Sequence, residues 1–143
     1  GLEDEDKKCI MTLYFRNSKL MLMFLIKKYK PSEVTKIFNS IKELIAAPTK
    51  WEKSKGFTSE IPQGTKILSI RESKNSIMID LSSNFEAGGG AESTYMKVKQ
   101  IIKTVNSNTN IPTYLYINGK QANVIGGEGI MIKQPLSERS FDE

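Results

Sequence analysis

Three consecutive glycines, Gly88, Gly89 and Gly90, separate a predicted strand from a predicted helix in the stretch NFEAGGGAES. A glycine-rich loop before a helix is where backbone N–H groups can converge on a phosphate. Neither G-x-x-x-x-G-K-[ST] nor G-x-G-x-x-G, the usual nucleotide-binding patterns, is present there. Glu86 and Glu92 flank the loop and would repel a phosphate. We therefore predict that the glycines serve the path of the backbone rather than a nucleotide.

Three carboxylates are candidates for a second kind of chemistry, glycan hydrolysis by an acid–base pair. Asp80 and Glu86 are close in sequence, and Glu128 stands in a glycine-rich loop. A glycosidase needs two carboxylates at a fixed separation. Asp80 falls at the end of a predicted strand, where aspartate commonly caps the following turn, and Glu128 is explained as a solvated charge. We expect no catalytic residues and no enzyme activity.

Metal and nucleophile chemistry is limited by composition. Cys9 is the single cysteine, and the chain contains no histidine. A zinc site of the usual ligands cannot be assembled from this set. A Ser–His–Asp or Cys–His nucleophile system is excluded for the same reason. We therefore expect no metal and no cofactor.

The charge of the chain is moderately basic. Lysine and arginine number 21 against 16 acidic residues, which gives a formal net charge of +5. The basic residues are scattered, so they form no stripe that follows nucleic-acid phosphates, and we expect no nucleic-acid partner. Weak attraction to anionic surfaces remains open, with the stretch KKYK at 27–30 as its best local support.

The pattern of apolar residues predicts the elements that position these groups. The first helix is expected to begin at Pro31 and Ser32 and to end before Pro48. A glycine turn at Asn118-Gly119 predicts a type I′ hairpin. Strands are predicted at 9–17, 19–29, 65–72, 76–82, 113–117 and 121–125, with a loop at 48–64. Apolar stripes predict the two helices, at Val34, Ile37, Phe38, Ile41, Leu44 and Ile45, and at Tyr95, Val98, Ile101, Ile102 and Val105.

The order ββαββαββ predicts an α+β fold. We expect a two-layer sandwich with a mainly antiparallel sheet and two helices on one face. The 143 residues suffice for one domain. We assign 1–9 to a disordered lead-in, 10–136 to the domain and 137–143 to a C-terminal tail.

Four stretches, SEIPQGTKILSI, IMIDLSSNFEAGGGAES, YLYINGK and IGGEGIMIKQPL, follow one another with a characteristic order and spacing. In this succession the chain resembles the GerMN domain of spore germination and sporulation proteins, over about residues 40–136. The Lys- and Asn-rich second helix departs from the family pattern. The matching positions, which we interpret as a structural motif, are Pro62, Gly64, Asp80, Gly88, Gly89, Gly90, Gly119, Gly126, Gly127 and Gly129.

The resemblance implies an extracytoplasmic domain of a Gram-positive bacterium, attached to the membrane as a lipoprotein or by a signal anchor. Membrane contact is expected only through such an N-terminal anchor, if one preceded Gly1 and was removed. The fold is similar to ring-building domains of envelope assemblies, and the family is not known for catalysis. We expect a structural or assembly role in sporulation, germination or cell-wall processes, through contacts with envelope proteins or with further copies of the chain. A carbohydrate- or anionic-polymer-binding module, less readily one that hydrolyses the wall, is the alternative.

Overall fold

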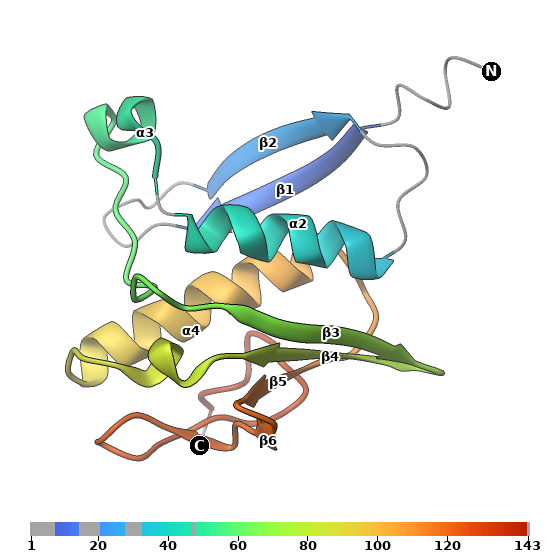
Figure 1. Ribbon diagram of the computed structural model, residues 1–143, viewed down its shortest axis with the longest axis vertical. Helices are drawn as coiled ribbons and strands as arrows, with labels where there is room; N and C mark the ends of the chain where they lie inside the picture. The colour runs from blue at the N-terminus through green and yellow to red at the C-terminus, as the bar shows by residue number, and fades with distance from the viewer. Residues whose placement is uncertain (1–7, 15–20, 28–32, 47, 143) are drawn as a thin grey trace.

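A mixed four-stranded sheet forms the base of the molecule (Figure 1). The computed structural model describes residues 8–14, 21–27, 33–46 and 48–142. The strands lie in the order β3-β4-β5-β6, with β3 at Ile67–Ser73, β4 at Ser76–Leu81, β5 at Thr113–Ile117 and β6 at Lys120–Gln121. Residues alternate between buried and half-buried along β4 and β5, which is the pattern of a sheet covered on one face. The predicted α+β class is confirmed.

The sheet is mixed, because β4 and β5 run parallel whereas the β3–β4 and β5–β6 pairings are antiparallel, as predicted for most of the sheet. The helix α4 (Ala91–Asn106) connects these two neighbouring strands. A chain that leaves one strand and returns along a helix enters the next strand in the same direction. The predicted helix α4 therefore sets the direction of β5 relative to β4.

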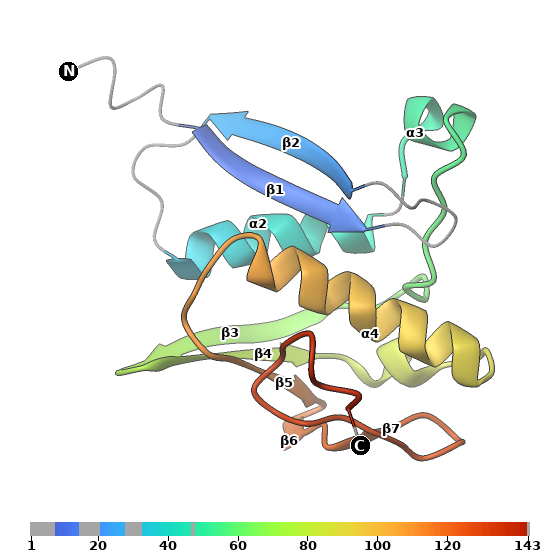
Figure 2. The same cartoon turned by 180° about the vertical axis from the view of Figure 1, so that it is seen from behind.

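The two N-terminal strands form a separate sheet. Strands β1 (Lys8–Tyr14) and β2 (Met21–Lys27) pair antiparallel, from Lys8 opposite Lys27 to Tyr14 opposite Met21. Figures 1 and 2 show α2 (Glu33–Ile45) and α4 between this hairpin and the larger sheet, and β1 contacts both helices. The two predicted strands are confirmed, but as a hairpin they add a third layer on the far side of the helices, so the expected two-layer arrangement is incomplete.

The core lies between the two helices and the inner face of the larger sheet. The middle of the first predicted stripe, Ile37, Ile41 and Leu44, is fully buried on α2. Phe38 and Tyr95, each predicted at a helix–sheet contact, are instead 41% and 38% exposed. Further core side chains come from β4, β5 and α4, among them Ile77, Ile79, Leu81, Leu115, Val98, Ile101, Ile102 and Val105. The predicted start of α2 at Pro31 and Ser32 lies outside the described residues.

The predicted loop 48–64 contains a short helix, α3 (Lys50–Ser54). Thr49 caps it, since its hydroxyl accepts a hydrogen bond from the Glu52 amide at 3.2 Å. The Glu52 carboxylate accepts one in return from the Thr49 amide at 2.6 Å. This reciprocal pair is the capping box, whose sequence pattern T-x-x-E is present here and marks the helix that apolar periodicity missed.

The predicted turn after β5 is confirmed. Asn118 and Gly119 have φ of 51° and 86°, and positive φ at both central residues is what a type I′ turn requires. The hairpin continues only through the short β6. The chain then forms a second small hairpin of β7 (Val124–Ile125) and β8 (Ile130–Met131), with Gly126, Gly127 and Gly129 at its tip.

On the side of β5 that faces away from β4, the part of the strand not covered by β6 pairs with the side chain of Gln134. Gln134 donates hydrogen bonds to the carbonyls of Leu115 and Ala122, each at 3.0 Å, and accepts one from the Leu115 amide at 3.1 Å. The Leu136 amide then bonds the Thr113 carbonyl at 2.8 Å. An amide side chain can pair with a backbone N–H and C=O as another strand would. Gln134 therefore holds the C-terminal segment, residues 133–142, against the sheet.

Replacing Gln134 with alanine is expected to lower the free energy of unfolding by about 1–2 kcal/mol, because it removes the partner of the Leu115 amide and of the Ala122 carbonyl. Gln134→Glu should be destabilising as well, since a carboxylate cannot donate to the two carbonyls. Urea denaturation followed by circular dichroism measures the change. Gln121→Ala, which removes an exposed side chain bonded to the Asn123 side chain, is the control, and an equal loss in both variants would contradict this role.

Candidate functional site

Several motif residues gather at the carboxyl end of the parallel strands β4 and β5. Asp80, near the end of β4, accepts a hydrogen bond from the Gly119 amide at 3.0 Å. The Asn118 amide bonds the Leu81 carbonyl beside it at 2.8 Å. Asp80 was expected to cap the turn after its own strand. It caps the β5–β6 turn instead, because the ends of parallel neighbours meet at one edge of the sheet.

The other motif positions shape the loops around this edge. The Pro62 carbonyl accepts hydrogen bonds from the Thr65 amide at 3.3 Å and the Thr65 hydroxyl at 2.7 Å, which closes the turn through Gly64. Gly89 has φ of +74°, and a Cβ there would lie 2.5 Å from the Ser93 hydroxyl. Gly88 also has positive φ, whereas Gly90 takes an extended conformation ahead of α4. The prediction that the triplet serves backbone geometry stays a prediction.

A buried lysine lies beneath these loops. Lys97 of α4 has no exposed surface, and its Nζ has no hydrogen-bond partner among the described residues. The ammonium lies 5.6 Å from the centroid of the Phe85 ring. Burial lowers the pKa of Lys97, and the carboxylates of Glu86, Glu60 and Glu128 oppose that shift. Because Lys97 is buried, its charge is not presented to an approaching partner.

The predicted carboxylates are therefore divided between two environments. Asp80 is engaged in a backbone hydrogen bond, whereas Glu86 and Glu128 act electrostatically on Lys97. Within 33–46 and 48–142, no group of three or more acidic, cysteine or histidine residues is arranged to hold a metal ion. No helix in the described part of the chain has the length and apolarity to cross a bilayer.

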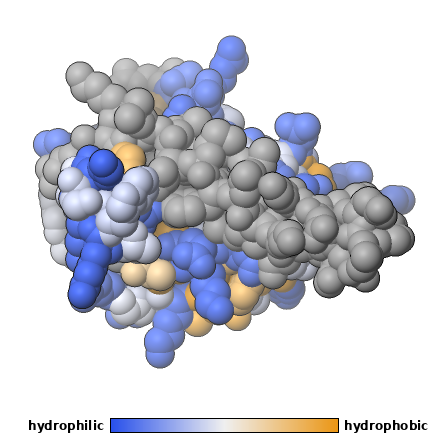
Figure 3. Space-filling model, turned by 90° about the horizontal axis from the view of Figure 1, so that it is seen from above, coloured by the Kyte–Doolittle hydropathy of each residue, from blue (hydrophilic) through white to orange (hydrophobic). Residues whose placement is uncertain are grey.

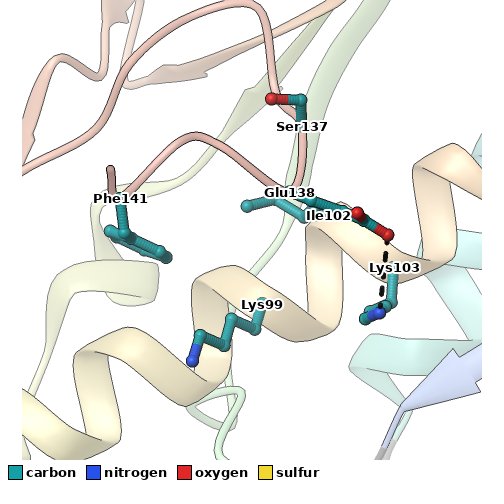
Figure 4. A pocket seen from close by; sticks show the side chains of 6 residues that line it. All are labelled: Lys99, Ile102, Lys103, Ser137, Glu138 and Phe141. Carbon is teal, nitrogen blue, oxygen red and sulfur yellow. Dashed lines mark ion pairs between the residues drawn. The ribbon is translucent and has the colours of Figure 1, made fainter. Parts of the chain in front are cut away.

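A groove runs between α4 and the C-terminal segment (Figure 4). It has a volume of about 400 Å³, and Lys99, Ile102 and Lys103 of α4 line it. Ser137, Glu138 and Phe141 line it from the C-terminal segment. A second hollow of about 470 Å³, lined by Glu92, Tyr95, Met96, Lys99 and Phe141, adjoins it through its shared residues.

The C-terminal segment forms one wall of the groove. The Lys133 amide bonds the Ser140 carbonyl at 2.7 Å, and the Ser140 side chain is buried. The Phe141 ring meets the Tyr95 ring edge-on, with centroids 4.8 Å apart. Within the predicted C-terminal tail 137–143, Ser140 and Phe141 thus contact the domain, and the aromatic Phe141 among polar neighbours is the sequence signal for such a contact.

The groove has an apolar floor and is bordered by charged side chains of both signs. Ile102 and Phe141 are its apolar side chains, and Met96 is an apolar side chain of the adjoining hollow. The Lys103 ammonium lies 4.0 Å from the Glu138 carboxylate, and the Glu138 side chain is 82% exposed. An exposed pair at that distance contributes little to stability, so both groups can exchange partners. The arrangement can bind an apolar side chain and orient charged neighbours, and the described lining residues include no nucleophile–base pair.

Comparisons with known proteins agree with this fold. The family model described as "Germane: Sporulation and spore germination" matches residues 12–123. The first GerMN domain of the sporulation protein GerM from Bacillus subtilis is similar at a TM-score of 0.66 and 19% identity, covering 93% of this chain and 98% of that one. The tandem GerMN structure from the same protein gives 0.68 and 18%, covering 90% of this chain and 45% of that one.

A structure from Clostridium perfringens, described as a lipoprotein, is also similar, at a TM-score of 0.58 and 18% identity. The match covers 84% of this chain and 81% of that one. No curated protein sequence matches. At these identities the solved structures show the fold, and the predicted GerMN resemblance is confirmed.

Proposed function

This chain belongs to the Germane family of sporulation and spore-germination domains, and on that premise we propose that it is a non-catalytic assembly domain of the cell envelope. The partner is an envelope protein or a second copy of the chain. It docks into the groove between α4 and the C-terminal segment. The similarity to a Clostridium perfringens protein described as a lipoprotein supports an envelope location, as does the similarity to GerM.

The groove is the observation on which this proposal depends. Its apolar floor at Ile102 and Phe141 offers a place for one aliphatic or aromatic side chain of a partner. Lys99 is exposed beside it, and a charge at the rim of an interface guides approach more than it raises affinity. An apolar centre with a charged rim is the usual anatomy of a protein interface. No described feature favours hydrolysis of the wall.

Site-specific photo-crosslinking tests the proposal in cells of the producing organism. A benzoylphenylalanine at position 138, on the groove, should yield a protein adduct in the envelope fraction after irradiation. The same residue at position 74, in the β3–β4 turn, is the control and should yield none. An adduct of twice the mass of the chain identifies a second copy as the partner.

Lys99→Glu tests whether the groove itself is used, because it reverses the charge at its rim without changing the core. The yield of the adduct at position 138 should fall about tenfold, the size of effect that a repulsive rim charge produces on association. Equal adducts at positions 138 and 74, or an adduct that contains wall polymer and no protein, would contradict an assembly role.

A further inference from the structure

The α3 segment, residues 49–56, presents an unusual set of exposed side chains. Trp51 is 59% exposed, although tryptophan is a large and predominantly buried residue. Lys50, Lys53 and Lys55 are all exposed around it. The Lys55 ammonium lies 5.8 Å from the centroid of the Trp51 ring. The segment therefore offers one indole surrounded by three cations.

The single acidic residue of the segment is turned away from this surface. Glu52 is 2% exposed, and its carboxylate is bound to the Thr49 amide in the capping box. The same hydrogen bonds that begin the helix thus hold the negative charge on the inner side. The side chains that an approaching surface meets are the indole and the three ammonium groups.

The position of α3 leaves these side chains accessible. Figures 1 and 2 show α3 beside one end of the β1–β2 hairpin, far from the four-stranded sheet and from the C-terminus. Seen from above in Figure 3, the left end, where α3 lies in Figure 1, carries strongly hydrophilic residues beside residues of intermediate hydropathy. The α3 segment shares no lining residue with the α4 groove.

We propose that the α3 segment binds the surface of an anionic phospholipid bilayer. Tryptophan is favoured at the boundary between headgroups and acyl chains, because its ring is apolar and its N–H is polar. Lysines near an anionic leaflet are attracted to its negative surface potential. A purely ionic polymer would use the lysines and leave the indole exposed, so the combination favours a lipid surface. This contact is separate from the partner groove and from any N-terminal anchor.

The chain contains one tryptophan, so Trp51 fluorescence reports this contact directly. Titration of the full chain with vesicles of phosphatidylglycerol and phosphatidylcholine should shift its emission to shorter wavelength. Brominated acyl chains should quench it. Vesicles of phosphatidylcholine alone should produce neither change, and high salt should reverse the shift. An unshifted, unquenched spectrum in the presence of bound vesicles would overturn the proposal.

Charge variants identify the surface that is used. In vesicle co-sedimentation, the triple change Lys50→Gln, Lys53→Gln and Lys55→Gln should weaken binding about 100-fold, at about fivefold for each lysine. The matched control carries the same loss of charge at other exposed lysines, Lys74→Gln, Lys120→Gln and Lys133→Gln, and should bind within about threefold of the unmodified chain. Equal weakening in both variants would show that net charge alone acts and would overturn the proposal.

Trp51→Ala separates a lipid contact from attraction by charge alone. It should weaken vesicle binding about tenfold while leaving thermal unfolding unchanged, because the ring is mostly exposed. Purified teichoic acid distinguishes the two sources of phosphate. A blue shift of Trp51 with soluble polymer as large as that with vesicles would assign the segment to the polymer and contradict the bilayer.

Discussion

Replacing Phe85 with alanine is expected to lower the free energy of unfolding by about 3–5 kcal/mol. Phe85 lies in the short helix η1 (Ser83–Glu86), and its side chain is fully buried. Alanine would leave a cavity where the ring packs beneath α4. It would also remove the aromatic face 5.6 Å from the Lys97 ammonium, which has no hydrogen-bond partner among the described atoms. Both losses lower the free energy of unfolding.

Equilibrium urea denaturation of the two proteins measures this difference. Phe38→Ala is the matched control, because it removes the same atoms from a side chain that is 41% exposed. Its cost should be about 1 kcal/mol, since only part of that ring is withdrawn from water on folding. Comparable losses for the two variants would show that Phe85 does not hold η1 against α4.

Two substitutions of Lys97 should change the free energy of unfolding in opposite directions. Lys97→Glu is expected to cost at least about 3 kcal/mol, because it places a buried carboxylate near Glu60, Glu86 and Glu128. Lys97→Met keeps a long side chain and removes a buried charge, so it should raise the free energy of unfolding by about 1 kcal/mol near neutral pH.

The gain from Lys97→Met should depend on pH in a defined direction. Burial lowers the pKa of Lys97 in the folded protein below its ordinary value of 10.5. Between these two pKa values the unfolded chain binds more protons than the folded chain, so the unmodified protein becomes more stable as pH rises. Below both pKa values, Lys97 is charged in the folded and the unfolded chain, and the unmodified protein bears the full cost of burying that charge. The advantage of Lys97→Met should therefore be largest near neutral pH and shrink toward pH 10.5.

Thermal and urea unfolding across this pH range, compared between the two proteins, give the measurement. Lys99→Met is the control, since Lys99 is exposed two residues away on the same helix. It should change neither the stability at neutral pH nor its dependence on pH. A Lys97→Met protein that is less stable at every pH would mean that the attraction of the glutamates exceeds the cost of burial.

The sequence predicts those elements whose pattern is local. The stripe at Ile37, Ile41 and Leu44 identifies α2, and Asn118-Gly119 identifies a turn, because each needs only neighbours along the chain. The separate layer formed by β1 and β2 is different, since it depends on which face of the helices the hairpin covers. Helix periodicity contains no such information.

The candidate sites were harder to predict for a related reason. Lys97, Gln100 and Thr104 are polar yet fully buried on α4, so a stripe of apolar residues describes only part of the buried surface of that helix. The Gln100 side chain accepts a hydrogen bond from the Glu60 amide at 2.9 Å and donates one to the Ser59 hydroxyl at 3.1 Å. Such pairings join residues about forty positions apart and leave no local signal.

The closure of β5 by Gln134 has a consequence for how chains could join. On that border the sheet offers only the two-residue β6 and a stretch already occupied by 134–136. At the opposite border, no strand in the described part of the chain pairs with the outer edge of β3. Backbone pairing between molecules through the larger sheet therefore has a single long edge per chain, that of β3. When the β3 edges of two molecules pair, neither stays free, so pairing through this sheet ends at a dimer and does not propagate into a fibre.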